Sequence, residues 1–450
     1  MSWLFRIHLI AVLLVAPILG VTQSTVLVWQ DEFNYTGLPD SEKWGYDVGG
    51  DGWGNNELQF YTEADTANAR VQNGKLIIEA HKENYSGNEY TSARLITKNK
   101  GDWIYGRFEV KAKVPAGTGT WPAIWMLPTD WEYGGWPSSG EIDIMEYVGY
   151  EPDVIHQTVH TQAYNHLNGT EQSSTSNVET AEEEFHLYAI EWTPDKIDFF
   201  VDGRLRFTFE NEGTWQKWPF DKRFHLLLNV AIGGNWGGAH GVDDSIFPVQ
   251  MEVDYVRVYK QIDEFQIAGE EYIQPNAQQV EYSITNVVDA EFEWSVPGDA
   301  EIISGQGTNT ISVNWGDSEG TVSLELTANE ETYTYELPVK LLTVPEGAEH
   351  VLDDFDDGNI ENISNPNGEE NPFTFSESDS ELKVSYHNSD PGIWPKFIID
   401  FDRPIDLSNH ESMQVRLKTF NHSGSVNMRI DLMDQQGRQT NKSPVFAIEP

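Results

Sequence analysis

The sequence predicts an all-β protein made of sandwich domains. Across residues 26–260, short runs that are apolar throughout, or that alternate apolar and polar residues, are separated by clusters of Gly, Asn, Asp and Pro. No long stretch keeps a helical period. The run FFVDGRLRF is the clearest hairpin, because Asp202 and Gly203 suit a two-residue turn. At 450 residues the chain is long enough for several domains, each with its own core.

The N-terminal segment has the layout of a secretory signal. In MSWLFRIHLIAVLLVAPILG, Arg6 and His8 precede an apolar stretch, residues 9–19, which ends at Gly20. We therefore expect a signal peptide at residues 1–22 and a secreted, extracellular protein; a retained membrane anchor is the alternative. The chain has no Cys, so an exported fold would depend on core packing rather than on disulfides.

The chain is strongly acidic. It has 28 Lys and Arg against 73 Asp and Glu, which gives a formal net charge of −45 at pH 7. Such a surface repels phosphate backbones and anionic lipids, so we expect neither nucleic acid nor a membrane as a partner of the mature protein. An uncharged substrate is compatible with this charge, and we expect a monomer.

The composition changes after residue 260. Residues 264–343 form an acidic β pattern with turn signals every eight to twelve residues, as in FEWSV, TISVNW and GTVSLELTA, which predicts a seven-strand immunoglobulin-like sandwich. The connector TVPEGAEH follows, and residues 349–450 form a third β-rich region. The chain stops in FAIEP without a turn signal, so we expect this last domain to be incomplete.

The strand-like stretch GEIDIMEYVG carries three acids, Glu141, Asp143 and Glu146. Side chains on a regular strand alternate faces, so Glu146 would point away from the other two. A β-bulge at Ile144 and Met145 would return it to their face, with the glutamate Cα atoms about 13 Å apart. Paired carboxylates on a concave sheet suit hydrolysis of a glycosidic bond, which needs about 5–5.5 Å between them in retaining enzymes. An edge strand with solvated acids is the alternative.

GEIDIMEYVG resembles the Glu-x-Asp-x-x-Glu signature of glycoside hydrolase family 16, in the bulged form of its laminarinases, agarases and carrageenases. The lichenases of that family have an unbulged Glu-x-Asp-x-Glu. Further segments resemble laminarinases in the family's order, over residues 26–259: LVWQDEFN, GGDGWGNNELQFYT, YTSARLITK, YGRFEVKAKVP, GTWPAIWMLP, LYAIEWTPDKIDFFVDG, WPFDKRFHLLLNVAIGGNWGG and MEVDYVRVY.

The resemblance implies a concanavalin-like β-jelly-roll at residues 26–260, with a cleft across its concave sheet. It implies a secreted endo-1,3-β-glucanase that hydrolyses laminarin-type β-glucans with retention of configuration. Glu141 matches the nucleophile, Glu146 the general acid/base and Asp143 the assisting acid. The alternatives are hydrolysis of mixed-linkage β-glucan or of an agar-type galactan, and a non-catalytic glucan-binding protein. Sulfated carrageenan is disfavoured because the chain is poor in basic residues.

A glycan cleft needs flat aromatic rings beside hydrogen-bonding groups, because sugars present apolar C–H faces and hydroxyls. The tryptophans of GTWPAIWMLP and GGWPSSG suit such platforms, with core packing as the alternative. Arg94 could instead pair with a structural acid, and His160 could contact Asp143, the sugar or neither. The predicted substrate-binding residues are Asn56, Arg94, Trp121, Trp125, Trp136, His160, Asn235 and Trp236.

The resemblance also implies a structural Ca²⁺ away from the catalytic cleft, and no cofactor for catalysis. Its oxygen ligands would be Glu32, the carbonyl of Gly74 and Asp254, which are otherwise ordinary surface groups. The 12 His form no zinc-ligand pattern.

Two trailing regions resemble other modules. WSVPGDAEIISGQGT and VNWGDSEG are similar to PKD-like domains, which serve as spacers or weak interaction modules. VLDDFDDGN and WPKFIIDFDRPIDLSNHESMQVRLKTF resemble the start of a galactose-binding-like jelly roll of the carbohydrate-binding type.

Overall fold

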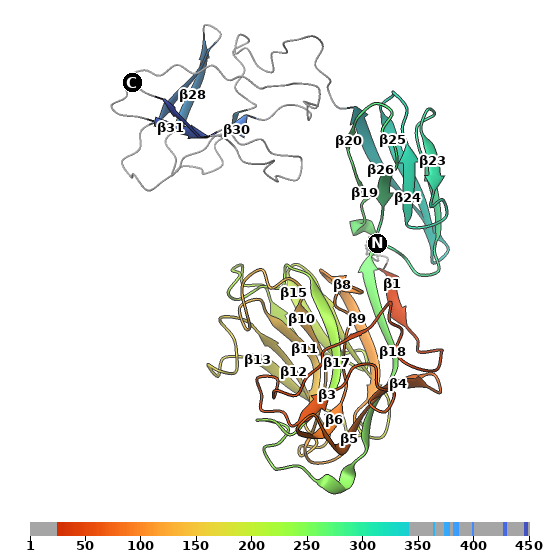
Figure 1. Ribbon diagram of the computed structural model, residues 1–450, viewed down its shortest axis with the longest axis vertical. Helices are drawn as coiled ribbons and strands as arrows, with labels where there is room; N and C mark the ends of the chain where they lie inside the picture. The colour runs from red at the N-terminus through yellow and green to blue at the C-terminus, as the bar shows by residue number, and fades with distance from the viewer. Residues whose placement is uncertain are drawn as a thin grey trace, which may run out of the picture. The chain divides into compact units, whose positions relative to one another are not determined.

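The computed structural model describes residues 25–341 (Figure 1). Beyond them it describes only the backbone of short strands: β27 (Ile363–Ser364), β28 (Phe373–Ser378), β29 (Glu381–Tyr386), β30 (Ile398–Ile399), β31 (Val426–Arg429) and β32 (Val445–Ile448). The predicted signal peptide and the predicted galactose-binding-like fold of residues 349–450 therefore lie outside the described residues. No described helix is apolar and long enough to span a bilayer.

The chain divides into two compact units, Met1–Phe265 with Thr285–Ala290, and Gln266–Ile284 with Glu291–Pro450. In the described residues of both units the regular structure is β, apart from two short 3₁₀ helices, η1 (Asp244–Ile246) and η2 (Ile262–Glu264). The all-β fold class is thus confirmed.

The first unit is a sandwich of two sheets. In both sheets many neighbouring strands are far apart in the sequence. The ten-stranded sheet has the order β16-β15-β14-β9-β18-β5-β6-β3, with β1 on β18 and β4 on β5. Its strands are β1 (Thr25–Asp31), β3 (Gln59–Tyr61), β4 (Ala69–Gln72), β5 (Lys75–Tyr85), β6 (Asn88–Ser92), β9 (Gly106–Lys113), β14 (His186–Trp192), β15 (Lys196–Val201), β16 (Arg204–Glu210) and β18 (Val249–Gln261).

The eight-stranded sheet carries the three acids and has the order β13-β12-β11-β10-β17-β7-β2, with β8 on β17. Its strands are β2 (Gly45–Tyr46), β7 (Arg94–Ile96), β8 (Asp102–Trp103), β10 (Thr120–Pro128), β11 (Glu141–Tyr147), β12 (Val154–His160), β13 (Gln172–Asn177) and β17 (Phe224–Ile232). Figure 1 shows β10, β11, β12 and β17 lying side by side.

Alternation along β10 gives the eight-stranded sheet its two faces. Ile124 and Met126 are fully buried, whereas Trp121 and Trp125 are partly exposed on the opposite face. Complete burial of each apolar side chain contributes about 1.5–3 kcal/mol, so the sheet is held firmly from its inner side. The outer face is left to carry polar and aromatic groups.

The hairpin predicted at Asp202 and Gly203 is confirmed. β15 and β16 pair with Val201 opposite Arg204, which leaves a two-residue turn. Both turn residues have positive φ, 50° and 72°, as a type I′ turn requires.

The bulge predicted in β11 is also confirmed. Between Asp143 and Glu146 this strand has two residues, Ile144 and Met145, where β12 has one, Gln157. The register against β10 shifts at the same place. Both inserted side chains are completely buried, so the bulge is anchored in the core.

The second unit holds two four-stranded sheets, β19-β21-β24-β23 and β20-β26-β25-β22. Its core includes Tyr282, Trp294, Val313 and Leu324, all almost completely buried. For residues 264–343 the sequence predicted seven strands, whereas eight are described there, of which β19 and β20 have only two residues each. The strands are β19 (Ala268–Gly269), β20 (Tyr272–Ile273), β21 (Val280–Ser283), β22 (Glu291–Ser295), β23 (Glu301–Ser304), β24 (Thr310–Asn314), β25 (Gly320–Ala328) and β26 (Glu331–Leu341).

Candidate active site

The bulge brings the three acids of β11 to one face of the sheet. Glu141 pairs with His160 of β12, and Glu146 pairs with His156. The two histidines are four residues apart on a regular strand, so they share a face, and their partners share it too. Asp143 pairs with Thr158, which lies between them. In a regular strand of this same sequence, without the bulge, Glu146 would point into the core.

Two tryptophan indoles hold the two glutamates. Trp136 Nε1 donates to Glu141 Oε2 at 2.6 Å, and Trp121 Nε1 donates to Glu146 Oε1 at 3.0 Å. Hydrogen bonds to a charged acceptor are stronger than neutral ones, so each indole fixes one carboxylate oxygen. The structure therefore places both tryptophans beside the acids, each with a partly exposed side chain.

Asp143 lies between the two glutamates on β11 and is only 2% exposed. It shares a side-chain hydrogen bond with Glu141. Its Oδ2 is 3.5 Å from His160 Nε2, and one polar atom each of Glu141, Asp143 and His160 lie within 4.8 Å of one another. A hydrogen bond between two carboxyl groups needs one proton, so one of the pair is neutral.

Burial raises the pKa of each of the three acids, but not equally. The pKa of Asp143 is well above its usual range, because burial is reinforced by the negative charges of Glu141 and Glu146. Burial and the charge of Glu141 raise the pKa of Glu146 to about 7, against the hydrogen bond from Trp121. The pKa of Glu141 is also raised by burial, but its hydrogen bonds from Asp143 and Trp136 and the charge of Arg94 favour the carboxylate. The shared proton therefore belongs to Asp143.

His160 contacts Asp143 as a neutral ring. Burial, and then the charge of His166, lower the pKa of His160 to about 4. Its ring lies 5.8 Å from the Trp136 ring, and His166 lies 5.0 Å from the same tryptophan. His160 is thus within reach of both the acid and the tryptophan, and it adds no positive charge near neutral pH.

A cation held between aromatic rings lies on the same sheet. The guanidinium of Arg94 is 4.7 Å from the Trp53 ring and 4.6 Å from the Trp125 ring. Its Nε is 3.0 Å from Asp47 Oδ2, so the ion pair that the sequence left open as an alternative is present. Trp53 and Asp47 were not predicted from the sequence, because nothing in the residues around them distinguishes a ring or an acid that contacts a distant arginine.

A chain of hydrogen bonds runs from Trp125 to a carboxyl group that the sequence analysis also missed. Trp125 Nε1 donates to Asn229 Oδ1 at 2.7 Å, and Asn229 Nδ2 donates to the Tyr61 hydroxyl at 3.0 Å. That hydroxyl and Gln59 Nε2 both donate to Glu57 Oε2, at 3.3 and 2.7 Å. Burial raises the pKa of Glu57. These hydrogen bonds therefore fix the orientation of the Trp125 indole.

The predicted rim residues come together. Asn56 Nδ2 donates to Asn235 Oδ1 at 2.8 Å, joining loops that are 179 residues apart. Trp236 packs edge-on against Trp121, with ring centroids 5.4 Å apart, and against His156 at 4.8 Å. All eight residues predicted to bind substrate thus form contacts with the acids or with one another; their role in binding stays a prediction.

The predicted calcium ligands carry other partners. Arg257 donates to both carboxylate oxygens of Glu32, at 2.6 and 2.9 Å. Lys111 Nζ is 2.9 Å from Asp254 Oδ2. A calcium ion needs these oxygens as ligands, so the residues in this arrangement do not fit it unless both ion pairs separate. Gly74 lies in the turn between β4 and β5, and calcium binding stays a prediction.

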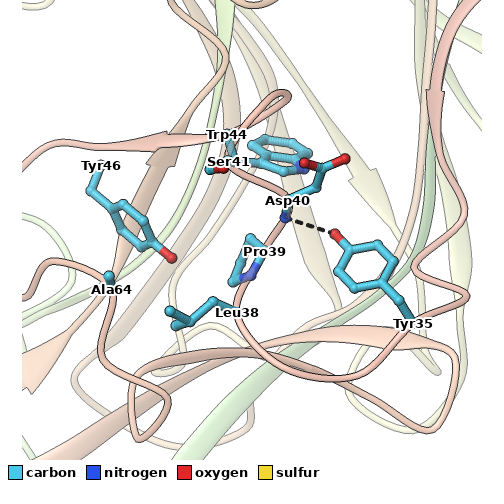
Figure 2. A pocket seen from close by; sticks show the side chains of 8 residues that line it. All are labelled: Tyr35, Leu38, Pro39, Asp40, Ser41, Trp44, Tyr46 and Ala64. Carbon is cyan, nitrogen blue, oxygen red and sulfur yellow. Dashed lines mark hydrogen bonds between the residues drawn. The ribbon is translucent and has the colours of Figure 1, made fainter.

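A separate cavity of about 480 Å³ is formed by residues between positions 35 and 64 (Figure 2). It is lined by Tyr35, Leu38, Pro39, Asp40, Ser41, Trp44, Tyr46 and Ala64. None of the three acids of β11 lines this cavity, and neither does any predicted substrate residue. Asp40 is the one acidic residue in its lining, so no second carboxyl group is present there. This cavity lacks the paired carboxylates that the sheet face of β11 provides.

Comparison with known proteins finds a family match for the unit that carries the three acids and another for the region that follows it. The family described as Glycosyl hydrolases family 16 matches residues 56–257, and the PKD-like domain matches residues 261–337. A beta-glucanase of Rhodothermus marinus is 57% identical over 268 residues, which cover 57% of this chain and 94% of the relative.

Solved structures give the same match. The laminarinase of Rhodothermus marinus has a TM-score of 0.53 and 58% identity, over 53% of this chain and 98% of that one. A non-specific endo-beta-1,3(4)-glucanase from family 16, crystallised with a gluco-oligosaccharide, has a TM-score of 0.52 and 47% identity, over 54% and 96% of the two chains.

Proposed function

Because the chain belongs to glycosyl hydrolases family 16, and is a glycoside hydrolase, we propose that it is an endo-1,3-β-glucanase that hydrolyses laminarin-type glucans with retention of configuration. One observation supports this proposal: the bulge puts Glu141 and Glu146 on the same face, where burial raises the pKa of Glu146 to about 7 while hydrogen bonds and the charge of Arg94 favour the carboxylate of Glu141. A retaining enzyme needs one ionised and one protonated carboxyl group at the start of its cycle.

In the first step Glu141 attacks the anomeric carbon while the bond to the leaving sugar breaks. Glu146 gives its proton to the departing oxygen, so the leaving sugar is released as a neutral alcohol. A pKa of about 7 keeps Glu146 protonated in mildly acidic solution, where this role requires it. Protonated Asp143 donates its hydrogen bond to Glu141 and steadies the attacking carboxylate.

In the second step Glu146 acts as a base. It takes a proton from a water molecule, whose oxygen attacks the anomeric carbon as the bond to Glu141 breaks. The second inversion restores the original configuration, and both glutamates regain their starting protonation states. The indoles of Trp121 and Trp136 hold the carboxylates in place through both steps.

Incubation with laminarin, mixed-linkage β-glucan and agarose tests the substrate. We expect reducing ends to appear fastest with laminarin, because the Rhodothermus marinus relative is a laminarinase. Slower release from mixed-linkage glucan is compatible, because another relative is a non-specific endo-beta-1,3(4)-glucanase. Release from agarose alone would overturn the proposal. The control Glu141→Gln should lower kcat by roughly 10²–10⁴-fold.

We further propose that the mature protein acts outside the cell as a monomer. The charged and apolar layout of residues 1–22 supports export. N-terminal sequencing of protein recovered from culture medium tests this, and recovery only from the membrane fraction would contradict it.

A further inference from the structure

Trp215 is the most exposed tryptophan in the part of the chain that the structure describes. It leaves 39% of its surface to solvent, whereas the other described tryptophans are buried or only partly exposed. Single exposed apolar residues are common on protein surfaces, so exposure alone carries no conclusion. Its surroundings, however, are built as a rigid support.

Trp215 lies flat against Tyr133. Their ring centroids are 5.4 Å apart and their planes differ by 10°. The Tyr133 hydroxyl donates to both carboxylate oxygens of Asp221 at 2.9 Å, and Lys222 Nζ lies 5.4 Å from the Tyr133 ring centroid. Stacking on one side and polar contacts on the other leave Tyr133 little freedom, so Trp215 presents a fixed flat surface.

The support is continuous with the candidate active site. Tyr133 and Trp136 are three residues apart on one loop, which places their Cα atoms within about 11 Å of each other. Trp136 donates to Glu141, and its ring packs against His166. The loop of Trp215 is tied to the loop of His166, because the backbone N–H of Ala163 donates to the carbonyl of Gln216 at 2.9 Å.

We propose that Trp215, supported by Tyr133, is an accessory binding site for a sugar ring of the polysaccharide, outside the positions occupied during bond cleavage. The inference rests on the proposed function for its choice of ligand. A flat indole matches the apolar C–H face of a glucose ring, and a neutral glucan needs no charged partner there. The short path to Trp136 lets one long chain contact both places, so the site should matter more for the polymer than for a short oligosaccharide held by the acids.

Binding is measured first without turnover. Full-length protein carrying Glu141→Gln, with and without Trp215→Ala, is run in native gels containing laminarin. We expect Trp215→Ala to weaken retardation by roughly 2- to 10-fold in apparent Kd, as loss of one aromatic contact would. The matched control is Tyr85→Ala, which removes a 43% exposed aromatic at the end of β5 that packs on Phe60 of β3; its retardation should be unchanged.

Kinetics then separates accessory binding from damage to the active site. In the otherwise unaltered protein, Trp215→Ala should raise KM for laminarin, leave kcat nearly constant, and leave kcat/KM for laminaritriose unchanged. Trp215→Phe, which keeps a flat ring, should restore most of the laminarin affinity. Equal losses on polymer and trisaccharide, or unchanged gel retardation, would overturn the inference. If laminarin is bound through Trp215 but not hydrolysed, the proposed function fails and the accessory site stands.

Discussion

At the scale of single residues, the acid/base role of Glu146 depends on a pKa raised to about 7. The proton must be present for the first step, so kcat/KM on laminarin should fall about tenfold per pH unit above that value. The hydrogen bond from Trp121 favours the charged form. Its removal in Trp121→Phe should therefore raise the pKa of Glu146 and move the alkaline limb to higher pH.

A pH profile of kcat/KM between about pH 4 and pH 10 checks this shift. Trp125→Phe is the control, because its indole donates to Asn229 and not to a catalytic acid. An alkaline limb that stays in place, or moves to lower pH, in Trp121→Phe would contradict the assignment of Glu146 as the proton donor.

The buried carboxyl group of Asp143 should lower the stability of the folded protein at high pH. Its pKa is raised in the folded state, so the folded protein binds a proton that the unfolded chain releases above its ordinary pKa of 3.8. Stability from this group is therefore greatest at low pH and decreases as pH rises through the raised pKa. Asp143→Asn keeps a donor to Glu141 without a titrating charge.

We expect Asp143→Asn to have a higher Tm than the unaltered protein at alkaline pH, with a difference that closes as pH falls toward about 4. Activity should fall, by about tenfold or more, because the tuning of Glu141 and Glu146 is lost. Scanning calorimetry across pH measures the first effect. A Tm below that of the unaltered protein at every pH would mean that the carboxyl group is stabilising.

At the scale of elements, the bulge in β11 predicts the outcome of a deletion. Removing Ile144 would regularise the strand to EIDMEY, in which Glu141, Asp143 and Glu146 still share one face. The loss of a fully buried isoleucine costs about 2–5 kcal/mol, within the range that a stable domain tolerates. We expect a folded protein with lower Tm and measurable laminarin hydrolysis.

Deletion of Ile142 is the matched control. It lies in the regular part of β11, so its removal places Glu141 and Asp143 on opposite faces. Hydrolysis should then disappear. Equal activity in both deletion variants would show that the face on which the acids lie does not matter.

The same strand explains how much the sequence alone could predict. Three acids within six residues, read against strict alternation, locate both the acids and the bulge. The support around them joins distant segments: Asn229 meets Tyr61 across 168 residues, and Arg94 stacks on Trp53 and Trp125. A single sequence contains no signal for such pairings, which is why Trp53 and Glu57 were missed. The predicted number of strands in residues 264–343 falls one short of the eight described, because strands of two residues, such as β19 and β20, show no period.

At the scale of the whole molecule, all predicted catalytic and substrate residues belong to the first compact unit. That unit has its own two-sheet core, and a domain with its own core folds independently as a rule. A protein ending at Phe265 lacks only Thr285–Ala290 of this unit and keeps every strand of both sheets, so it should keep kcat/KM on laminarin within about twofold of the full chain. Reducing-end assays on both proteins test this, and loss of activity with folding retained would assign the PKD-like domain a direct part in catalysis.

In the proposed reaction Glu141 is the nucleophile of a retaining mechanism, and the bulge in β11 places it on the same face as Glu146. A 2-deoxy-2-fluoro laminaribioside with a good leaving group slows the second step and traps the covalent intermediate. Peptide mapping by mass spectrometry then locates the added sugar. We expect one label per chain, on Glu141. A label on Glu146, or turnover with inversion and no label, would contradict this mechanism.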